Sequence, residues 1–96
     1  MREEDCARVS DFVKALTNPL RLRILCVLQE SEKTVSEIVS LTEAKQANVS
    51  IQLGILRSRG IVTPRRCENN VYYRVADDRV IRVLEMMREL TVSVRG

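Results

Sequence analysis

The sequence predicts a mainly α-helical domain with one two-stranded β-hairpin, and three observations favour this fold class. The 96 residues are 45% hydrophobic and 30% charged, which provides enough apolar side chains for one core but not for two. Residues 1–96 are therefore expected to form a single domain. Glycine (three) and proline (two) are scarce and aromatic residues make up only 3%, a composition that favours helices joined by short connections. Most apolar residues recur at helical spacing, and only residues 61–66 and 71–75 are rich in β-branched and aromatic side chains.

The first predicted helix covers residues 4–16, and the second begins where Asn18 can act as N-cap and Pro19 can occupy the first helical position. The first helix has one apolar stripe, formed by Cys6, Val9, Phe12, Val13 and Leu16. The second helix, to about residue 29, has two apolar sides, formed by Leu20, Ile24, Val27 and Leu28 and by Leu22, Leu25 and Cys26. Because so small a domain cannot bury both sides in one core, the second side predicts a subunit interface.

Thr34 and Glu37 have the spacing of a capping box and open a short third helix. A fourth helix is expected to run from Lys45 to Arg59, with Gly60 as its C-terminal stop. Two helices joined by so tight a turn form a helix-turn-helix.

Residues 61–66 and 71–75 are predicted to form the hairpin, with 68–70 as the turn because asparagine tolerates left-handed geometry. Pro64 confines the first strand to a sheet edge or to a strand start. A fifth helix follows, capped by Asp77 or Asp78. Five helices plus this hairpin make a winged helix-turn-helix.

The apolar stripes of the first and last helices predict a homodimer. The last helix carries Val80, Val83, Leu84, Met87 and Thr91 on one side. A monomer of this size cannot cover both stripes, so a second copy of the chain is expected to do so. The predicted interface residues are Val9, Val13, Leu16, Leu22, Val80, Leu84 and Met87.

The charge is distributed unevenly along the chain, whose net value is +3. Six basic residues between Lys45 and Arg74 face only one acidic residue, Glu68, so this stretch carries an excess of five positive charges and the remainder is mildly acidic. A concentrated basic segment is typical of nucleic-acid binding proteins, although a solvated surface of chance composition gives the same pattern.

The fourth helix supports DNA binding more directly. With Val49, Leu53 and Leu56 directed to the core, its outward face is small, polar and nearly uncharged, whereas a merely solvated helix would carry lysine and glutamate there. Amide side chains can read adenine, isoleucine can touch a thymine methyl group, and arginines on the hairpin can hold phosphates. Arg74 can equally cover apolar surface with its alkyl stem. The predicted DNA-binding residues are Lys45, Gln46, Ala47, Asn48, Ser50, Ile51, Gln52, Arg57, Arg65, Arg66, Asn69 and Asn70.

Several functional classes are excluded or disfavoured. The chain has no histidine, no glycine-rich phosphate loop and no nucleophile with a partner base, so no enzyme is expected. Three widely spaced cysteines indicate reduced thiols, and the lack of a membrane span or signal peptide predicts a cytoplasmic protein without membrane contact. The alternative class, a winged-helix module for protein–protein assembly, predicts an apolar or acidic fourth helix and no basic hairpin, contrary to this sequence.

Four segments in order, residues 18–25, 46–50, 60–62 and 71–75, resemble the ArsR/SmtB family of bacterial and archaeal repressors. The match spans nearly the whole chain at the family's spacings. The resemblance implies a dimeric winged helix-turn-helix repressor whose first and last helices build the dimer interface. Such a dimer binds double-stranded operator DNA and leaves it when a metal ion or thiol oxidation alters the dimer. Two-fold symmetry predicts an inverted-repeat operator.

The sequence departs from the family at its effector sites and in its reading helix. Ile51 and Gln52 stand where many members have a basic residue followed by histidine, so the operator sequence cannot be transferred. The segment that corresponds to the family's cysteine-containing metal motif, residues 35–38, has no thiol, and Asp77 and Asp78 of the last-helix motif lack histidine partners. No metal site and no cofactor are therefore expected.

The thiols are the remaining candidates for a switch. Cys26 resembles in position one reactive cysteine of thiol-responsive members, whose partner cysteine lies in the last helix, but residues 77–96 contain none. Cys6 is the only plausible substitute, whereas Cys67 lies on the hairpin. Three alternatives stay open: a Cys6–Cys26 redox pair, arsenic or a soft metal bound by thiols, and no thiol switch at all, with Cys26 as a small core residue.

Overall fold

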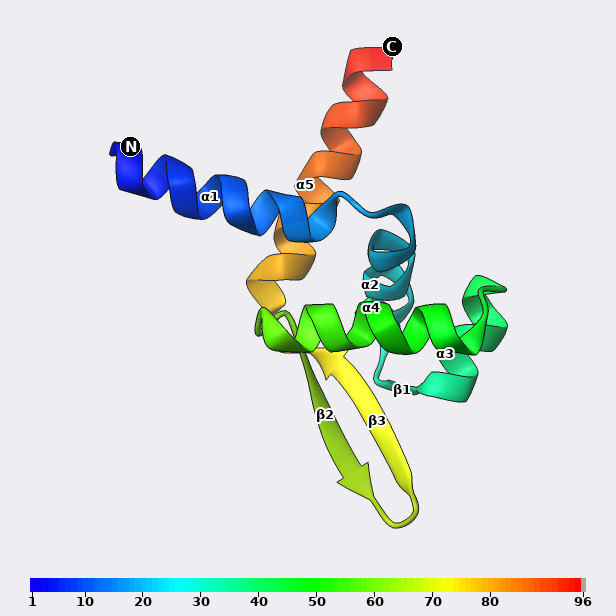
Figure 1. The fold of residues 1–96 in the computed structure, drawn as a ribbon. Helices are drawn as coiled ribbons and strands as arrows, with labels where there is room; N and C mark the ends of the chain where they lie inside the picture. The colour runs from blue at the N-terminus through cyan, green and yellow to red at the C-terminus, as the bar shows by residue number, and fades with distance from the viewer. Residues whose placement is uncertain (96) are drawn as a thin grey trace.

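The protein was analysed as a computed structural model that describes the backbone of residues 1–95 and the side chains of residues 1–92. Figure 1 shows five helices and a small sheet, which confirms the predicted fold class. In chain order the elements are α1 (Glu3–Leu16), α2 (Pro19–Glu30), β1 (Lys33–Thr34), α3 (Val35–Thr42), α4 (Gln46–Ser58), β2 (Val62–Cys67), β3 (Asn70–Val75) and α5 (Asp78–Arg95).

The helix boundaries follow the capping residues that the sequence indicates. The Asn18 Oδ1 atom accepts hydrogen bonds from the backbone N–H groups of Leu20 (2.9 Å) and Arg21 (3.1 Å) and so opens α2. At α3 the Thr34 hydroxyl accepts from the Glu37 N–H (3.2 Å) while the Glu37 carboxylate accepts from the Thr34 N–H (2.8 Å). These contacts satisfy backbone donors that a helix start leaves unpaired. For this reason α2 and α3 both begin where the sequence predicts.

The sheet has three strands rather than the predicted two. Its order is β1-β3-β2, with Lys33 opposite Tyr73 and Thr34 opposite Tyr72 in an antiparallel ladder. The two residues of β1 carry no strand pattern of their own, because their pairing depends on a partner almost forty positions away. Pro64 lies on β2, which is an edge strand, as its missing N–H requires.

The hairpin turn also differs from the expectation. Cys67 pairs with Asn70, which leaves a loop of two residues, and Glu68 adopts the left-handed conformation (φ 57°) instead of an asparagine. The register therefore decides which residue takes the positive φ. Gly60 has φ 72° just after α4, as expected for a helix stop.

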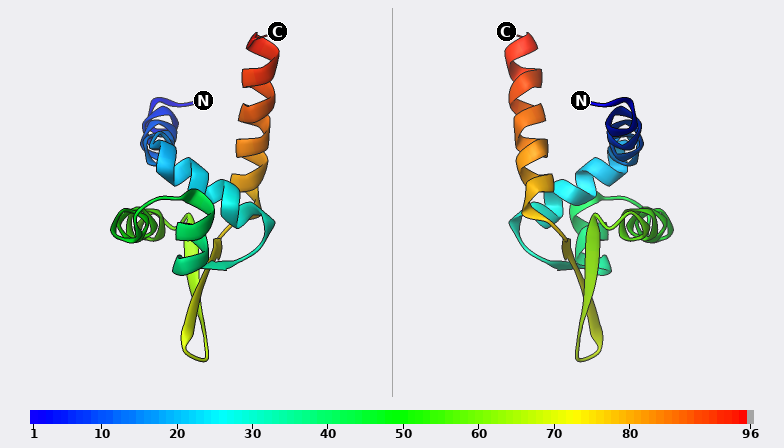
Figure 2. Two further views of the ribbon diagram at one scale, coloured as in Figure 1. Left: turned by 90° about the vertical axis from the view of Figure 1, so that its right-hand side faces the viewer. Right: turned by 90° about the vertical axis from the view of Figure 1, so that its left-hand side faces the viewer.

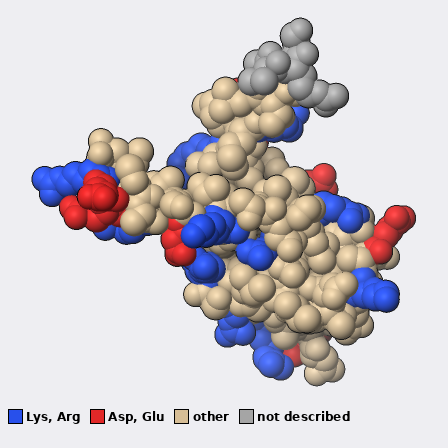
Figure 3. Space-filling view, turned by 45° about the horizontal axis from the view of Figure 1, so that its top comes forward, with Lys and Arg blue, Asp and Glu red and all other residues tan. Residues whose placement is uncertain are grey.

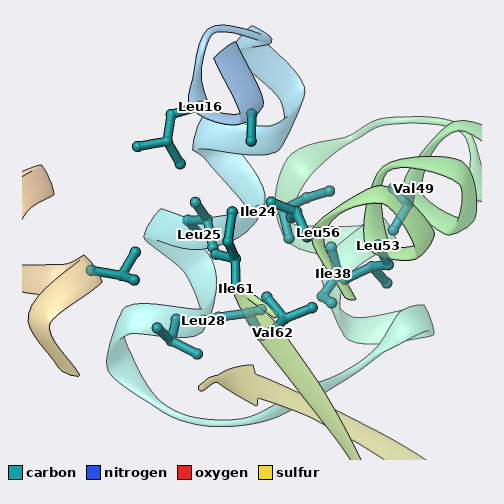
Figure 4. Close-up of a cluster of buried hydrophobic side chains, with 13 residues drawn as sticks. Leu16, Ile24, Leu25, Leu28, Ile38, Val49, Leu53, Leu56, Ile61 and Val62 are labelled. Atoms are coloured by element: carbon teal, nitrogen blue, oxygen red, sulfur yellow. The ribbon is translucent and has the colours of Figure 1, made fainter. Parts of the chain in front are cut away.

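The core lies among α2, α3, α4 and the base of the wing, as the hairpin β2–β3 is called here. Figure 4 shows side chains of α2 and α4 directed toward one another across this core. The residues that are almost completely buried include Ile24, Leu25, Ile38, Val49, Leu53, Leu56, Ile61 and Val62. Leu25 was predicted on a separate interface side of α2, which is wrong, since the chain itself covers this residue.

Two helices project from this body, and they are called the arms: α1 and α5. Figure 2 shows α5 and the wing extending in opposite directions. The radius of gyration is 14.3 Å, against about 12–13 Å for a compact domain of this length. Within the described residues, no helix has the length and apolar character needed to cross a membrane.

Candidate nucleic-acid interface

Helix α4 presents one side to the core and the opposite side to solvent. Val49, Leu53 and Leu56 are buried, which fixes the rotation of the helix about its axis. Ile51 is 58% exposed at the centre of the outward side. The other exposed residues on or beside this side are Lys45, Gln46, Ala47, Asn48, Ser50 and Gly54. A helix with small, uncharged side chains outward has the size and chemistry to enter a DNA major groove.

Gln52 was predicted to contact DNA bases, but in the structure its side chain is turned toward Arg21 of α2. It is half-buried, and its Oε1 atom accepts a hydrogen bond from Arg21 Nε at 2.8 Å. A second Arg21 nitrogen, Nη1, donates to the Ala15 carbonyl at 2.9 Å. Because arginine can only donate, the Gln52 amide oxygen must point at Arg21. Gln52 thus ties α4 to the corner between α1 and α2, a role that sequence reasoning missed because its partner lies 31 residues away.

Two further arginines hold the same region together. Arg59, after the end of α4, forms an ion pair with Asp11 of α1. Arg23 of α2 donates to the Thr42 carbonyl at the end of α3. The first contact braces the end of α4 against α1, and the second joins α2 to the end of α3.

The register of the wing places its two adjacent arginines on opposite faces. Arg65 lies opposite Tyr72, and Arg66 lies opposite Val71. Successive side chains of a strand point to opposite faces of the sheet. Arg65 and Arg66 therefore cannot act as one pair of phosphate ligands, although both were predicted to hold phosphates.

Arg65 has an intramolecular partner. Its guanidinium forms a bidentate ion pair with Glu32, with Nε 3.1 Å from Oε2, and lies 5.4 Å from the centre of the Tyr72 ring. The hydrogen bond from Arg65, with the nearby charges of Arg65 and Arg74, lowers the pKa of Glu32 below its usual value. This face of the wing is occupied by internal contacts that brace it against the segment before β1.

The opposite face of the wing forms a notch with the end of α4. Arg57 of α4 and Arg66 of β2 line this cavity of about 430 Å³, together with Pro64, Val71 and Tyr73. Both arginines are exposed. The notch therefore offers two guanidinium groups from different elements around one opening.

The remaining predicted interface residues lie at the tip of the wing, where Asn69 and Asn70 are exposed. Arg74 is exposed on the same face as Arg65. Figure 3 shows one face of the molecule on which Lys and Arg outnumber Asp and Glu, with a broad uncharged area between them. This distribution suits a polyanion whose backbone meets the rim while its bases meet the uncharged centre.

The predicted dimer residues divide into two sets. Leu16 and Val80 are only 4% and 8% exposed and belong to the chain's own core, so the expectation that a second copy covers them is wrong. Val9 and Val13 of α1 are 49% and 46% exposed. Met87 is 37% exposed, and Leu22 and Leu84 are half-buried. The exposed large apolar side chains of the arms that the interface prediction left out are Phe12, Val83, Met86, Leu90 and Val92. The spacing of 83, 86 and 90 is helical, so the missed residues were visible in the sequence.

A groove of about 780 Å³ lies between α2 and α5, lined in part by Leu22, Cys26, Leu84 and Met87. Cys26 is exposed, so the expectation that it is a small core residue is wrong. Cys6 and Cys67 are also free and exposed. Figure 1 shows the start of α1, which carries Cys6, extending away from α2, so no Cys6–Cys26 bond forms within one copy as described.

Residues 18–63 match the family described as bacterial regulatory protein, arsR family. A biofilm growth-associated repressor from Agrobacterium fabrum is 35% identical over 85 residues, which are 88% of this chain and 73% of that protein. The transcriptional repressor BigR from Xylella fastidiosa has a TM-score of 0.82 at 29% identity, over 98% of this chain and 93% of that chain. A homodimeric winged helix-turn-helix DNA-binding domain from Mycobacterium bovis, a possible ArsR-family regulator, has a TM-score of 0.80 at 30% identity, over 95% and 87% of the two chains.

Proposed function

The chain belongs to the arsR family of bacterial regulatory proteins, and from that premise we propose that it is a homodimeric repressor that binds an inverted-repeat operator. The coarser statement, that it is a DNA-binding transcriptional regulator and not an enzyme, follows from the family. A winged-helix module for protein assembly alone is correspondingly disfavoured.

The exposed outward side of α4 is the single observation that carries the proposal. Its small and amide side chains, such as Ala47, Asn48 and Ser50, allow close approach to base edges, and Ile51 offers an apolar contact for a thymine methyl group. Arg57 and Arg66 lie beside it, where the DNA backbone would pass. Gln52 and Arg65 are less available, because Arg21 and Glu32 already engage them.

The arms support the dimer. Many large apolar side chains of α1 and α5 are exposed, among them Val13, Met86 and Leu90. Monomeric proteins rarely expose large contiguous apolar patches. A second copy related by a two-fold axis would cover these side chains and would place two copies of α4 on successive major grooves, about 10 base pairs apart.

The effector is proposed to be other than a histidine-bound metal, since the sequence has no histidine. Among the residues that the structure describes, no cluster of three or more potential metal ligands occurs. The exposed thiols Cys6 and Cys26 keep two proposals testable, a redox pair formed between copies and a thiol-bound arsenic or soft metal. Operator affinity of the wild type, Cys6→Ser and Cys26→Ser, with and without oxidant or arsenite, decides between them and an effector that involves no thiol.

Selection of random duplexes with the purified protein tests the function. We expect enrichment of an inverted repeat bound by two chains, with affinity that falls by about 10³–10⁵ between 50 and 200 mM salt if about 6–10 phosphates are neutralised. Asn48→Ala is expected to relax base preference at one position per half-site by about 1–3 kcal/mol. A failure to enrich any duplex, or binding that ignores salt, would refute the proposal.

A further inference from the structure

We propose that Arg57 and Arg66 act together on a single backbone phosphate, and that Arg65 takes no part in holding it. This inference rests on the proposed DNA-binding function and states which arginines of the wing and of α4 bind the DNA backbone. It makes the junction between α4 and the wing, and not the whole basic segment, the phosphate-binding site.

Helix α4 and strand β2 each contribute one arginine to the same notch. Arg57 comes from the last turns of α4 and Arg66 from β2, nine positions later, yet both line the same notch of about 430 Å³. Side chains that share a strand face with Arg66, or lie opposite it, form the rest of the wall: Pro64, Val71 and Tyr73. These groups are largely apolar, so the two guanidinium groups are the charges that an anion entering the notch would meet.

Arg57 and Arg66 also differ from Arg59 and Arg65 in their ion pairing. The carboxylates that pair with arginines elsewhere are engaged on other sides of the molecule: Glu32 with Arg65 on the opposite wing face, and Asp11 with Arg59 at α1. No ion pair among the described residues involves Arg57 or Arg66. Their donors are therefore available to an external partner, whereas two nitrogens of Arg65, Nε and Nη2, already donate to Glu32.

The shape of DNA favours a backbone contact at the junction between α4 and the wing. A helix in the major groove and a hairpin that reaches the adjacent minor groove must straddle the sugar–phosphate backbone that separates the two grooves. The notch lies between α4 and the wing, which is where this backbone would pass. Arginine suits the position, because its planar group can give two parallel hydrogen bonds to phosphate oxygens.

The test uses the highest-affinity duplex recovered by selection and replaces its phosphates, one at a time, with uncharged methylphosphonates. For the wild type we expect one phosphate per half-site whose replacement weakens binding about tenfold or more, as loss of a charge-assisted contact implies. Arg57→Gln and Arg66→Gln should each weaken binding, lower the salt slope by about one per chain, and abolish the sensitivity at that same phosphate. The double variant should lose less than the two single effects combined, because both act on one group.

Arg65→Gln is the matched comparison, since it makes the same substitution one residue away on the other wing face. Any loss of affinity should leave the sensitivity to the notch phosphate intact. Arg8→Gln, which removes an exposed charge of α1, controls for net charge. The inference is overturned if Arg65→Gln abolishes the same sensitivity, or if Arg57→Gln and Arg66→Gln affect different phosphates.

Inorganic phosphate distinguishes a DNA phosphate from a free anion as the occupant. Exchanging chloride for phosphate at constant ionic strength should leave the Kd for the duplex unchanged. Selective weakening of the wild type, but not of the double variant, would show that the notch holds a free anion and would overturn the inference. If selection enriches no duplex at all, it is the proposed function that fails.

Discussion

The core-facing apolar stripes of α2 and α4 are covered by the chain itself, whereas most of the apolar residues on α1 and α5 are not. Ile24 and Leu53 are almost fully buried in the body, but Val13 and Leu90 on the arms are about half exposed. All four helices carry apolar residues at helical spacing in the sequence. The difference arises because α2 and α4 have neighbours on several sides, while the arms project from the body (Figure 2). The body is therefore packed by contacts within one chain, and a second copy in the proposed dimer is what would cover the arms.

The largest expected effect is the loss of a body side chain. Leu53→Ala removes a fully buried group between α4 and the core, so the free energy of unfolding should fall by about 2–5 kcal/mol. Urea unfolding followed by circular dichroism measures this change. Leu41→Ala is the matched control, because Leu41 is 57% exposed, and it should change stability by less than about 0.5 kcal/mol. Equal losses for the two variants would contradict the assignment of the core.

A charged side chain introduced on an arm should disrupt the proposed dimer without unfolding the chain. Met86→Glu places a carboxylate on the exposed side of α5 and should produce a monomer in sedimentation, while the circular dichroism of the body is retained. Operator affinity should fall by at least about 100-fold, since two linked half-sites bind more tightly than one. Arg82→Gln, on the same helix, changes the net charge by the same single unit and controls for charge. A dimer that survives Met86→Glu would show that the arms do not form the interface.

A smaller effect is expected at the cap of α2. Asn18→Ala leaves two backbone donors without their side-chain acceptor and should lower the free energy of unfolding by about 1 kcal/mol. Because α2 lies in the body, the loss should appear in global unfolding. Asn18→Asp, which keeps an acceptor, should restore most of the stability. No difference between the two variants would mean that the cap contributes nothing.

The smallest effect compares two carboxylates at helix starts, one in the body and one in an arm. Hydrogen bonds from Thr34 lower the pKa of Glu37, and those from Arg79 lower the pKa of Asp77 from 3.8 to about 2. A carboxylate whose pKa is lowered on folding stabilises the protein above its unfolded pKa and loses that contribution as the pH falls through its folded pKa. For Asp77 this window runs from 3.8 down to about 2.

Unfolding midpoints measured across acid pH should therefore decline below the unfolded pKa values. Glu37→Gln should make the decline of the body shallower, and Asp77→Asn should do so mainly for the helix signal of α5. Glu37 is exposed and the Asp77 side chain is 43% exposed, so the changes should be modest. An unchanged profile in both variants would contradict the two hydrogen-bonding assignments.

The sequence predicted the elements with local signals closely. Asn18 with Pro19, the box formed by Thr34 and Glu37, and Gly60 fixed the ends of α2, α3 and α4 because a cap acts within a few residues of its helix. The strand β1, which the sequence did not predict, had no such signal. Its two residues form a strand only because they pair with the backbone of β3, which is distant in the sequence. The outward side of α4 could likewise be inferred from the spacing of its buried residues.

What the tertiary structure decided is which of the predicted side chains are free. Arg65 and Arg66 are neighbours in the sequence and equally basic, but the sheet register places them on opposite faces of the wing. Arg65 forms an ion pair with Glu32, whereas Arg66 lines the notch together with Arg57. The arms show the same division, because Leu16 lies in the core while Val13 of the same stripe stays exposed. Periodicity and capping are properties of contiguous chain and are readable from sequence. Ion pairing and coverage depend on where distant segments come to lie, so only the folded chain determines them.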